Sequence, residues 1–288
     1  MNKLILIITL LFVLFECISQ KSVTIKPRLF DEANPSVKFK RKLIIETKVI
    51  EKSKVVIESF FTITKEFENN DTVIYYIKID SIASNLKKSL GDIDIVKMAA
   101  VEGIDLHLKI SKDFDSIQAL NLYEIEKKYI ENISKLKEFA PELRNINTDS
   151  LNYKSLVKNT FGWTYYLLFH KNDIEFQIPY NIKNDTLSKD DKQNYITKKL
   201  SFFSNKRIKN GFKLRSYYKI ESKPFSTNSI HKSYAKNTKY VDKTGLIKKI
   251  IYKRDSTLKD KTKSNEINGK EKSMTTYFKF YSEYTRLD

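Results

Sequence analysis

The most regular stretch of the chain reads Thr72-Val73-Ile74-Tyr75-Tyr76-Ile77-Lys78-Ile79-Asp80. Its odd-numbered residues fall on one face of an extended chain, because successive side chains of a strand point to opposite sides. The preceding run, 55–67, sets Phe61, Ile63 and Phe67 on one face in the same way. Between the two runs lies Glu68-Asn69-Asn70-Asp71, a cluster of turn-forming residues. Together the two runs predict an antiparallel β-hairpin.

Several further segments are rich in β-branched and aromatic residues, which favour strands. These predicted strands cover residues 38–50, 104–111, 115–120, 173–181, 196–204, 211–221, 246–253 and 273–284. The tract 253–272 is polar and charged, and we expect it to form a long, solvent-exposed hairpin loop before the last strand.

Two segments follow a helical rather than a strand pattern. An apolar stripe with steps of three and four consists of Leu122, Ile125, Tyr129, Ile133, Leu136 and Ala140, and Pro141 follows it. This spacing predicts an amphipathic helix. A second helix is predicted to begin near Asp149-Ser150, with Gly162 as a candidate end.

These elements predict an α+β, mainly β fold: a curved antiparallel sheet or partly open barrel with one or two amphipathic helices. Residues 20–36, with Pro27 and Pro35, read as an extended leader, and 37–288 as a single β-rich domain. The segments 113–120 and 242–250 both read as strand, acidic turn and strand. This faint repeat leaves open a division into two related halves, 37–148 and 149–288.

Residues 1–19 have the three parts of a secretory signal peptide. Lys3 precedes an apolar run from Leu4 to Phe15, and the small residue Ser19 precedes Gln20. This run is shorter than the roughly 20 residues that a membrane-spanning helix needs. We expect cleavage after Ser19 and a mature protein that is periplasmic, outer-membrane-associated or secreted.

Cys17 is the single cysteine, and it allows an alternative in which it carries lipid. Glu16 stands next to that cleavage point and fits it poorly, because signal peptidases need small side chains there. Cleavage after Ser19 would leave no cysteine in the mature chain. Disulfides, thiolate metal sites and cysteine nucleophiles would then be excluded.

The formal charge is +18, from 53 Lys and Arg against 35 Asp and Glu. Such a charge is typical of proteins that bind nucleic acid, anionic membranes or acidic glycans. Only seven of the 53 cations are arginines, and the lysines are scattered along the sequence. Proteins that recognise phosphates and bases usually also use arginine, whose planar guanidinium group donates two parallel hydrogen bonds. Nucleic-acid binding is therefore disfavoured.

Catalytic motifs are absent from the sequence. A histidine-dependent mechanism would have to use His107, His170 or His231, and there is no His-Glu-x-x-His, Gly-x-Ser-x-Gly or phosphate-binding glycine loop. A dispersed Ser-His-Asp triad stays open, because its members meet in space rather than in sequence. His107 alternates with Leu106 and Leu108, so we expect it on the polar face of its strand.

Candidate metal-binding patterns are incomplete. Asp113, Asp115 and Glu124 have the spacing of part of a calcium loop, but Ile117 and Gln118 occupy the places of a ligand and the required glycine. Asp92 and Asp94 share one strand face and are interpreted as a solvated edge. We therefore assign no catalytic, cofactor or metal residue.

At the level of layout, the export signal, the hairpin from Phe60 to Asp80, the motif from Asp113 to Leu120 and the helix after it resemble uncharacterised exported β-rich proteins of Gram-negative bacteria. The layout is also distantly similar to the curved-sheet proteins that carry lipoproteins across the periplasm. This resemblance supplies no functional residue.

We expect a non-enzymatic cell-envelope protein that binds an apolar ligand or a protein partner. Its aromatic residues, 12% of the chain, either pack the sheet or line an apolar pocket. The alternatives are a secreted hydrolase with a dispersed site involving His107, and a basic surface that binds anionic polymers.

Overall fold

The computed structural model describes residues 22–48, 52–84, 101–112, 116–139, 176–178, 180–190, 195–224, 230–262 and 272–288. The predicted signal segment, the second predicted helix, His170 and the Asp92–Asp94 pair lie outside these residues. The described elements are β1 (Val23–Ile25), β2 (Ser36–Lys48), β3 (Lys52–Glu68), β4 (Thr72–Ser84), β5 (Asp105–Ser111), β6 (Ile117–Ala119), α3 (Leu122–Phe139), β7 (Phe176–Ile178), β8 (Tyr180–Asp190), β9 (Tyr195–Ile208), β10 (Gly211–Pro224), β11 (Ile230–Val241), β12 (Ile247–Thr262) and β13 (Lys272–Arg286).

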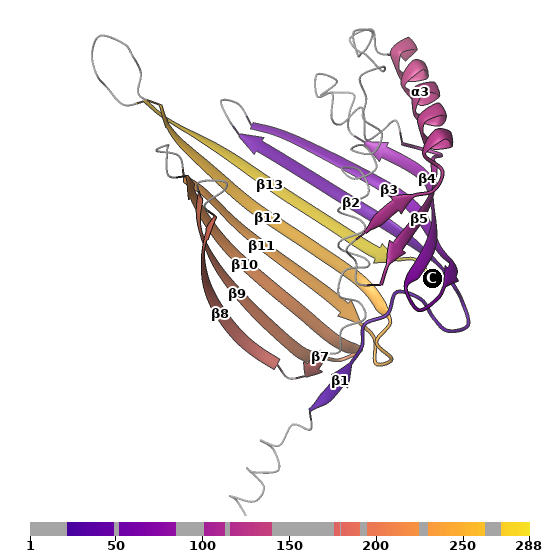
Figure 1. The fold of residues 1–288 in the computed structure, drawn as a ribbon, viewed down its shortest axis with the longest axis horizontal. Helices are drawn as coiled ribbons and strands as arrows, with labels where there is room; N and C mark the ends of the chain where they lie inside the picture. The colour runs from indigo at the N-terminus through magenta and orange to yellow at the C-terminus, as the bar shows by residue number, and fades with distance from the viewer. Residues whose placement is uncertain are drawn as a thin grey trace, which may run out of the picture.

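Eleven of these strands form one large sheet, seen broadside in Figure 1. Its order is β6-β5-β4-β3-β2-β13-β12-β11-β10-β9-β8, and every neighbouring pair is antiparallel. The described sheet is open, with β6 and β8 at its two edges. The prediction of a mainly β protein with an antiparallel sheet is therefore confirmed.

The sheet consists of two meanders that meet at its middle. One runs from β2 to β6 and the other from β8 to β13, and each places strands that are consecutive in sequence side by side. The pairing of β2 with β13, in which Arg41 lies opposite Tyr284, joins them. The proposed division between residues 148 and 149 lies outside the described residues and stays a prediction.

The hydrophobic core lies on one face of this sheet, which we call the core face; the opposite face is the outer face. Phe39, Phe61 and Tyr284 are buried there on three adjacent strands, with Phe61 5.8 Å from the Phe39 ring and 6.0 Å from the Tyr284 ring. These three aromatic side chains pack against one another in the core. Aromatic pairs at such distances add stability to that gained from burying their surface.

The predicted hairpin is confirmed as β3 and β4. Val73, Ile77 and Ile79 are buried on the core face, as the alternation predicts. The position predicted for Phe67 was wrong. The register shifts between Lys65 and Phe67, so Phe67 lies opposite Ile74 rather than on the face of Phe61, and half of it is exposed.

The first predicted helix is confirmed as α3. Ile125, Tyr129 and Ile133 have at most 1% of their surface exposed and belong to the same core cluster as Leu106 and Leu108 of β5. The helix therefore buries one stripe at the β5 end of the sheet, where Figure 1 draws it. Glu124 and Lys127, outside this stripe, are exposed.

Two expectations for the second meander were wrong. The tract 253–272 is not one long loop, because β12 continues to Thr262 and β13 begins at Lys272. β11 was not expected, although it spans twelve residues in the middle of the meander.

The leader region also has structure. Residues 23–25 form β1, which pairs with β7 in a separate two-stranded sheet, and Ile25 and Leu29 are buried in the core. The backbone of Arg28 exchanges hydrogen bonds with the turn before β12: its N–H donates to the carbonyl of Gly245 at 3.0 Å, and its carbonyl accepts from Ile247 at 2.9 Å.

Candidate functional site

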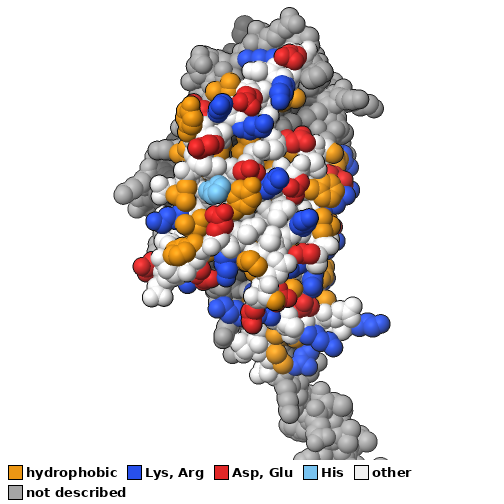
Figure 2. Space-filling view, turned by 90° about the vertical axis from the view of Figure 1, so that its right-hand side faces the viewer, with side chains coloured by type: hydrophobic (Ala, Val, Ile, Leu, Met, Phe, Trp, Pro, Cys, Tyr) orange, Lys and Arg blue, Asp and Glu red, His pale blue; other side chains and the backbone are white. Residues whose placement is uncertain are grey.

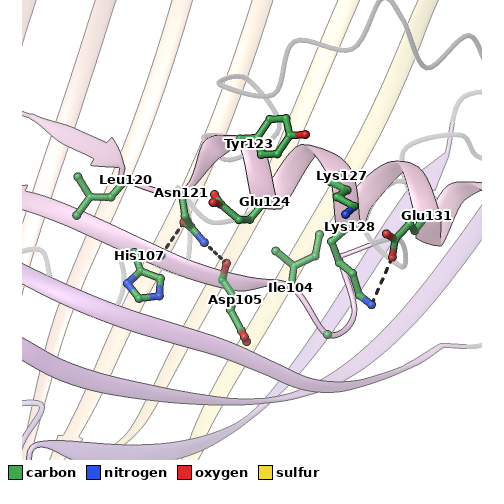
Figure 3. Close-up of a pocket in the computed structure, with 11 residues that line it drawn as sticks. Ile104, Asp105, His107, Leu120, Asn121, Tyr123, Glu124, Lys127, Lys128 and Glu131 are labelled. Atoms are coloured by element: carbon green, nitrogen blue, oxygen red, sulfur yellow. Dashed lines mark hydrogen bonds and ion pairs between the residues drawn. The ribbon is translucent and has the colours of Figure 1, made fainter.

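An open cleft of about 800 Å³ lies between β5 and α3. It belongs to the face shown in Figure 2, a mosaic of acidic, basic and apolar side chains in which no single kind dominates. The lining residues are Gly103, Ile104, Asp105, His107, Leu120, Asn121, Tyr123, Glu124, Lys127, Lys128 and Glu131. In Figure 3 the strand residues lie along one wall and the helix residues along the other.

Asn121 lies where the two walls of this cleft meet. Its carbonyl accepts the N–H of Ile125 and begins α3, while its side chain turns back to the edge of β5. The N–H of His107 donates to the Asn121 Oδ1 at 3.0 Å, and Nδ2 of Asn121 donates to the carbonyl of Asp105 at 2.9 Å (Figure 3). This side chain replaces a neighbouring strand where β6 has ended, because exposed strand edges leave backbone groups unpaired.

A second contact fixes the other end of the wall. Nδ2 of Asn132 donates to the carbonyl of Glu102 at 2.8 Å, which joins α3 to the loop before β5. Two charged residues on the exposed side of α3 also form an ion pair, with Lys128 Nζ 3.7 Å from Glu131 Oε2. The buried stripe and these contacts hold the helix wall in place.

His107 lies on the outer face with Asp105 and Lys109, as predicted from its alternation with leucines. Its Nδ1 is 3.5 Å from Glu66 Oε2, and its ring meets the Tyr76 ring edge-on at 4.9 Å. The pKa of Tyr76 is raised by partial burial, by its hydrogen bond to Asp105 and by the nearby charges of Asp105, Glu66 and Asp80. Tyr76 is therefore a neutral hydrogen-bond donor at neutral pH.

The other described histidine lies elsewhere in the sheet. His231 is on β11, which five intervening strands separate from β5 in the sheet order. Partial burial, with the charge of Arg254 as the smaller cause, lowers the pKa of His231, so this imidazole is neutral at pH 7. The structure does not bring the two described histidines together.

The incomplete calcium pattern gains no support from the structure. Asp113 and Asp115 lie outside the described residues, and Glu124 lines the cleft from α3. Among the residues that the structure describes, no group of three or more histidine, cysteine or acidic side chains is placed to hold a metal ion.

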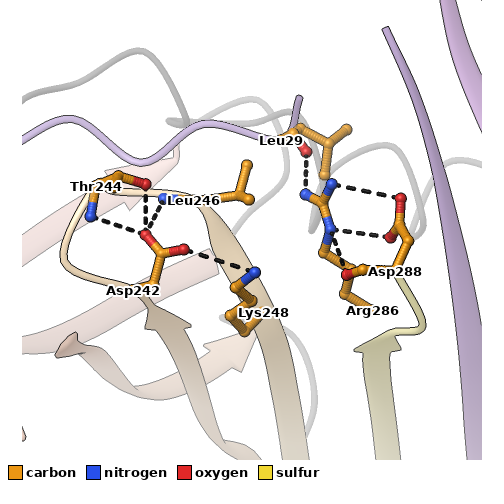
Figure 4. Close-up of polar contacts among 7 residues, drawn as sticks. All are labelled: Leu29, Asp242, Thr244, Leu246, Lys248, Arg286 and Asp288. Carbon is orange, nitrogen blue, oxygen red and sulfur yellow. Dashed lines mark hydrogen bonds and ion pairs between the residues drawn. The ribbon is translucent and has the colours of Figure 1, made fainter. Parts of the chain in front are cut away.

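The acidic turn at Asp242 is a structural feature. Asp242 Oδ1 accepts from the Thr244 N–H at 2.8 Å, the Thr244 hydroxyl at 2.7 Å and the Leu246 N–H at 3.0 Å (Figure 4). Partial burial acts to raise the pKa of Asp242, but these hydrogen bonds and Lys248 together lower it. Oδ1 of Asp242 thus binds three donors of its own turn.

The sequence did not predict the exposed apolar residues beside the cleft. Leu120 is 48% exposed and Tyr123 is 74% exposed, both on its rim. Tyr123 lies outside the apolar stripe of α3. Its position there was the one feature of the sequence that could have indicated an exposed aromatic residue. Large apolar side chains grouped on a surface often mark an interaction site.

No protein-family model matches the chain, and no curated protein matches its sequence. Solved structures with some similarity include a Bacteroides fragilis protein with a YmcC-like fold (9% identity, 92% of this chain and 98% of that one, TM-score 0.22). Others are Pseudomonas aeruginosa OccK5 (7% identity, 88% and 98%, TM-score 0.20) and OpdL (7% identity, 88% and 98%, TM-score 0.21). TM-scores this low do not establish a shared fold.

None of the described helices is long and apolar enough to cross a membrane.

Proposed function

We propose that the chain is an exported, non-enzymatic interaction protein of the bacterial cell envelope, and that the cleft between β5 and α3 binds a protein partner. The observation that carries this proposal is the exposure of Leu120 and Tyr123 on the rim of an open cleft. Tyrosine is enriched in protein interfaces because it offers a large apolar ring together with a hydroxyl group.

The charged lining favours a protein over a small apolar ligand. Glu124, Lys127 and Glu131 all face the cleft, and an apolar ligand would remove them from water without offering them partners. A protein surface can cover Leu120 and Tyr123 with apolar side chains and meet the charges at its polar rim.

Site-specific photocrosslinking tests this proposal. A photoreactive amino acid at Tyr123 is expected to capture one defined protein in the native envelope, and the additional change Leu120→Asp is expected to abolish that capture. The control carries the same group at Ile208, which is 37% exposed at the end of β9. Equal capture from both positions, or capture that survives Leu120→Asp, would contradict a partner site at the cleft.

Native mass spectrometry of the mature protein tests export and the class of ligand together. An unmodified terminus at Gln20 is the expected result. A small-molecule mass that remains bound would instead support an apolar ligand, and a terminus that begins with lipidated Cys17 would replace the predicted cleavage site.

A hydrolase is a second candidate, favoured by one arrangement. His107 is a lining residue of the cleft, with Glu66 Oε2 3.5 Å from its Nδ1, and Asp105 and Glu124 line the same space. Such a pair could orient an imidazole as a general base. This candidate requires a hydrolytic activity that His107→Ala abolishes and that Lys109→Ala, on the same strand face, leaves intact.

A further inference from the structure

The outer face of β10–β13 concentrates positive charge that is scattered in the sequence. The register and the strand alternation place nine cations and three carboxylates on this face in the described parts of these strands. The cations are Lys213, Arg215, Lys219, Lys232, Lys236, Lys249, Lys253, Lys259 and Lys279; the carboxylates are Glu221, Asp255 and Glu283. We call this surface the basic face.

Aromatic rings alternate with these cations. Phe202, Tyr217 and Tyr234 follow one another across β9, β10 and β11, with ring centroids 5.6 and 6.4 Å apart. Tyr234 is 42% exposed, so this row ends in a ring that solvent reaches.

Lysine ammonium groups lie over three of the rings. Lys236 lies 5.0 Å from the Tyr217 centroid, Lys213 lies 4.9 Å from Tyr240, and Lys253 lies 5.2 Å from Tyr281. Each pair presents a flat ring and a positive charge at the same place.

Part of this charge is not neutralised within the described structure. Two of the three carboxylates hold lysines, with Lys232 3.3 Å from Glu221 and Lys249 2.6 Å from Glu283. Lys219 and Lys279 are exposed beside the Tyr234 row, and neither forms an ion pair within the described part of the chain.

We propose that the basic face binds an acidic polysaccharide, with carboxylate or phosphate groups on the lysines and sugar rings on the tyrosines. The face extends over four strands, roughly 15 Å, and eight residue steps along β10, roughly 26 Å. An extended anionic chain fits this area, and its sugar rings offer flat bodies next to charged groups. β2, β3 and β4 separate this face from the cleft, so it is a second site.

Other anionic partners fit this face less well. Arg215 is the single arginine among its nine cations, whereas nucleic-acid sites rely heavily on the arginine fork. In the described middle of the strands its large exposed side chains are Tyr234 and Tyr277, without an exposed aliphatic group to enter a lipid bilayer.

Fluorescence anisotropy with labelled polygalacturonate oligosaccharides tests the proposal on the mature chain. The triple variant K219Q/K253Q/K279Q is expected to bind roughly ten- to a hundredfold more weakly at low salt. The control K38Q/K109Q/K243Q removes the same charge from exposed positions outside the basic face, and we expect it to bind within about twofold of wild type. Urea unfolding confirms that both triple variants remain folded.

A second pair of variants tests the rings. Tyr234→Ser is expected to weaken binding, whereas Tyr123→Ser, at the cleft, is not. Equal loss in the two triple variants would show nonspecific attraction by net charge and overturn the proposal. Absence of binding, or tighter binding of oligothymidylate or of phosphatidylglycerol vesicles under the same conditions, would overturn it as well.

Discussion

The turn between β11 and β12 shows how one carboxylate organises a loop. Asp242 Oδ1 accepts three hydrogen bonds, and Lys248 lies 3.6 Å from the other oxygen. The ionised form is favoured in the folded protein, which is why the pKa of Asp242 lies below its ordinary value of 3.8 despite partial burial. This loop also holds the backbone of Arg28 beside β12 through hydrogen bonds with Gly245 and Ile247.

Asp242→Asn is expected to lower the free energy of unfolding at pH 7 by no more than about 1 kcal/mol, because solvent screens this partly exposed carboxylate. The contribution of the charge is complete above the unfolded pKa and disappears as the pH falls through the lower folded pKa. Urea unfolding between pH 7 and pH 2.5 should therefore show the two proteins converging in acid. A constant difference over that range would contradict the assigned role of the charge.

Gly245 is expected to tolerate no side chain. Its φ is +90°, and a Cβ atom there would lie 2.5 Å from the carbonyl oxygen of Lys26. Gly245→Ala should lower the free energy of unfolding by about 2–3 kcal/mol. Gly103→Ala is the control, since its φ of +68° is also left-handed but its nearest neighbour is the end of Lys128 at 3.9 Å. Equal losses in urea unfolding would show that the contact with Lys26 is unimportant.

At the level of single elements, α3 depends on its buried stripe rather than on its exposed charges. Ile133→Ala is expected to lower the free energy of unfolding by about 2–4 kcal/mol, because it leaves a cavity beside Tyr129 and β5. Ile130→Ala, at a position 36% exposed, should cost less than about 1 kcal/mol. Urea unfolding followed by circular dichroism checks both, and similar losses would mean that the helix is not anchored by this stripe.

The sequence predicted elements whose two faces differ in polarity and missed those whose faces do not. The hairpin of β3 and β4 and the stripe of α3 follow clear periods. β11 has no such signal, since Ser233, Asn237 and Lys239 lie on its core face, where apolar residues were expected. The cleft was missed for another reason: Asn121 and Tyr123 acquire their roles from the edge of β5, which is a contact in space.

At the scale of the whole molecule, the middle of the sheet is expected to be its most stable part. β2 and β13 have neighbours on both sides, whereas β6 and β8 lie at the edges of the described sheet. Hydrogen exchange measured by mass spectrometry should show the slowest amides in β2, β3, β12 and β13 and the fastest in β6. Faster exchange in β2 than in β6 would show that the two meanders separate before the edges fray.

The order of the strands was beyond the reach of local pattern. Each meander is local in sequence, but the pairing of Arg41 with Tyr284 joins opposite ends of the described chain, and no turn or alternation specifies it. Long-range pairing depends on the complementarity of whole strands, so the sequence indicated an antiparallel sheet without indicating which strands form its centre.

The pairing of β2 with β13 also sets the order in which the sheet can close. In the exported chain proposed above, β2 crosses the membrane before β3–β12, and β13 crosses after all of them, so one side of β2 stays an unpaired strand edge until the last strand arrives. Such an edge can recruit strands from other unfinished chains. A chaperone that shields residues 36–48 until β13 emerges would protect the protein at its most vulnerable stage.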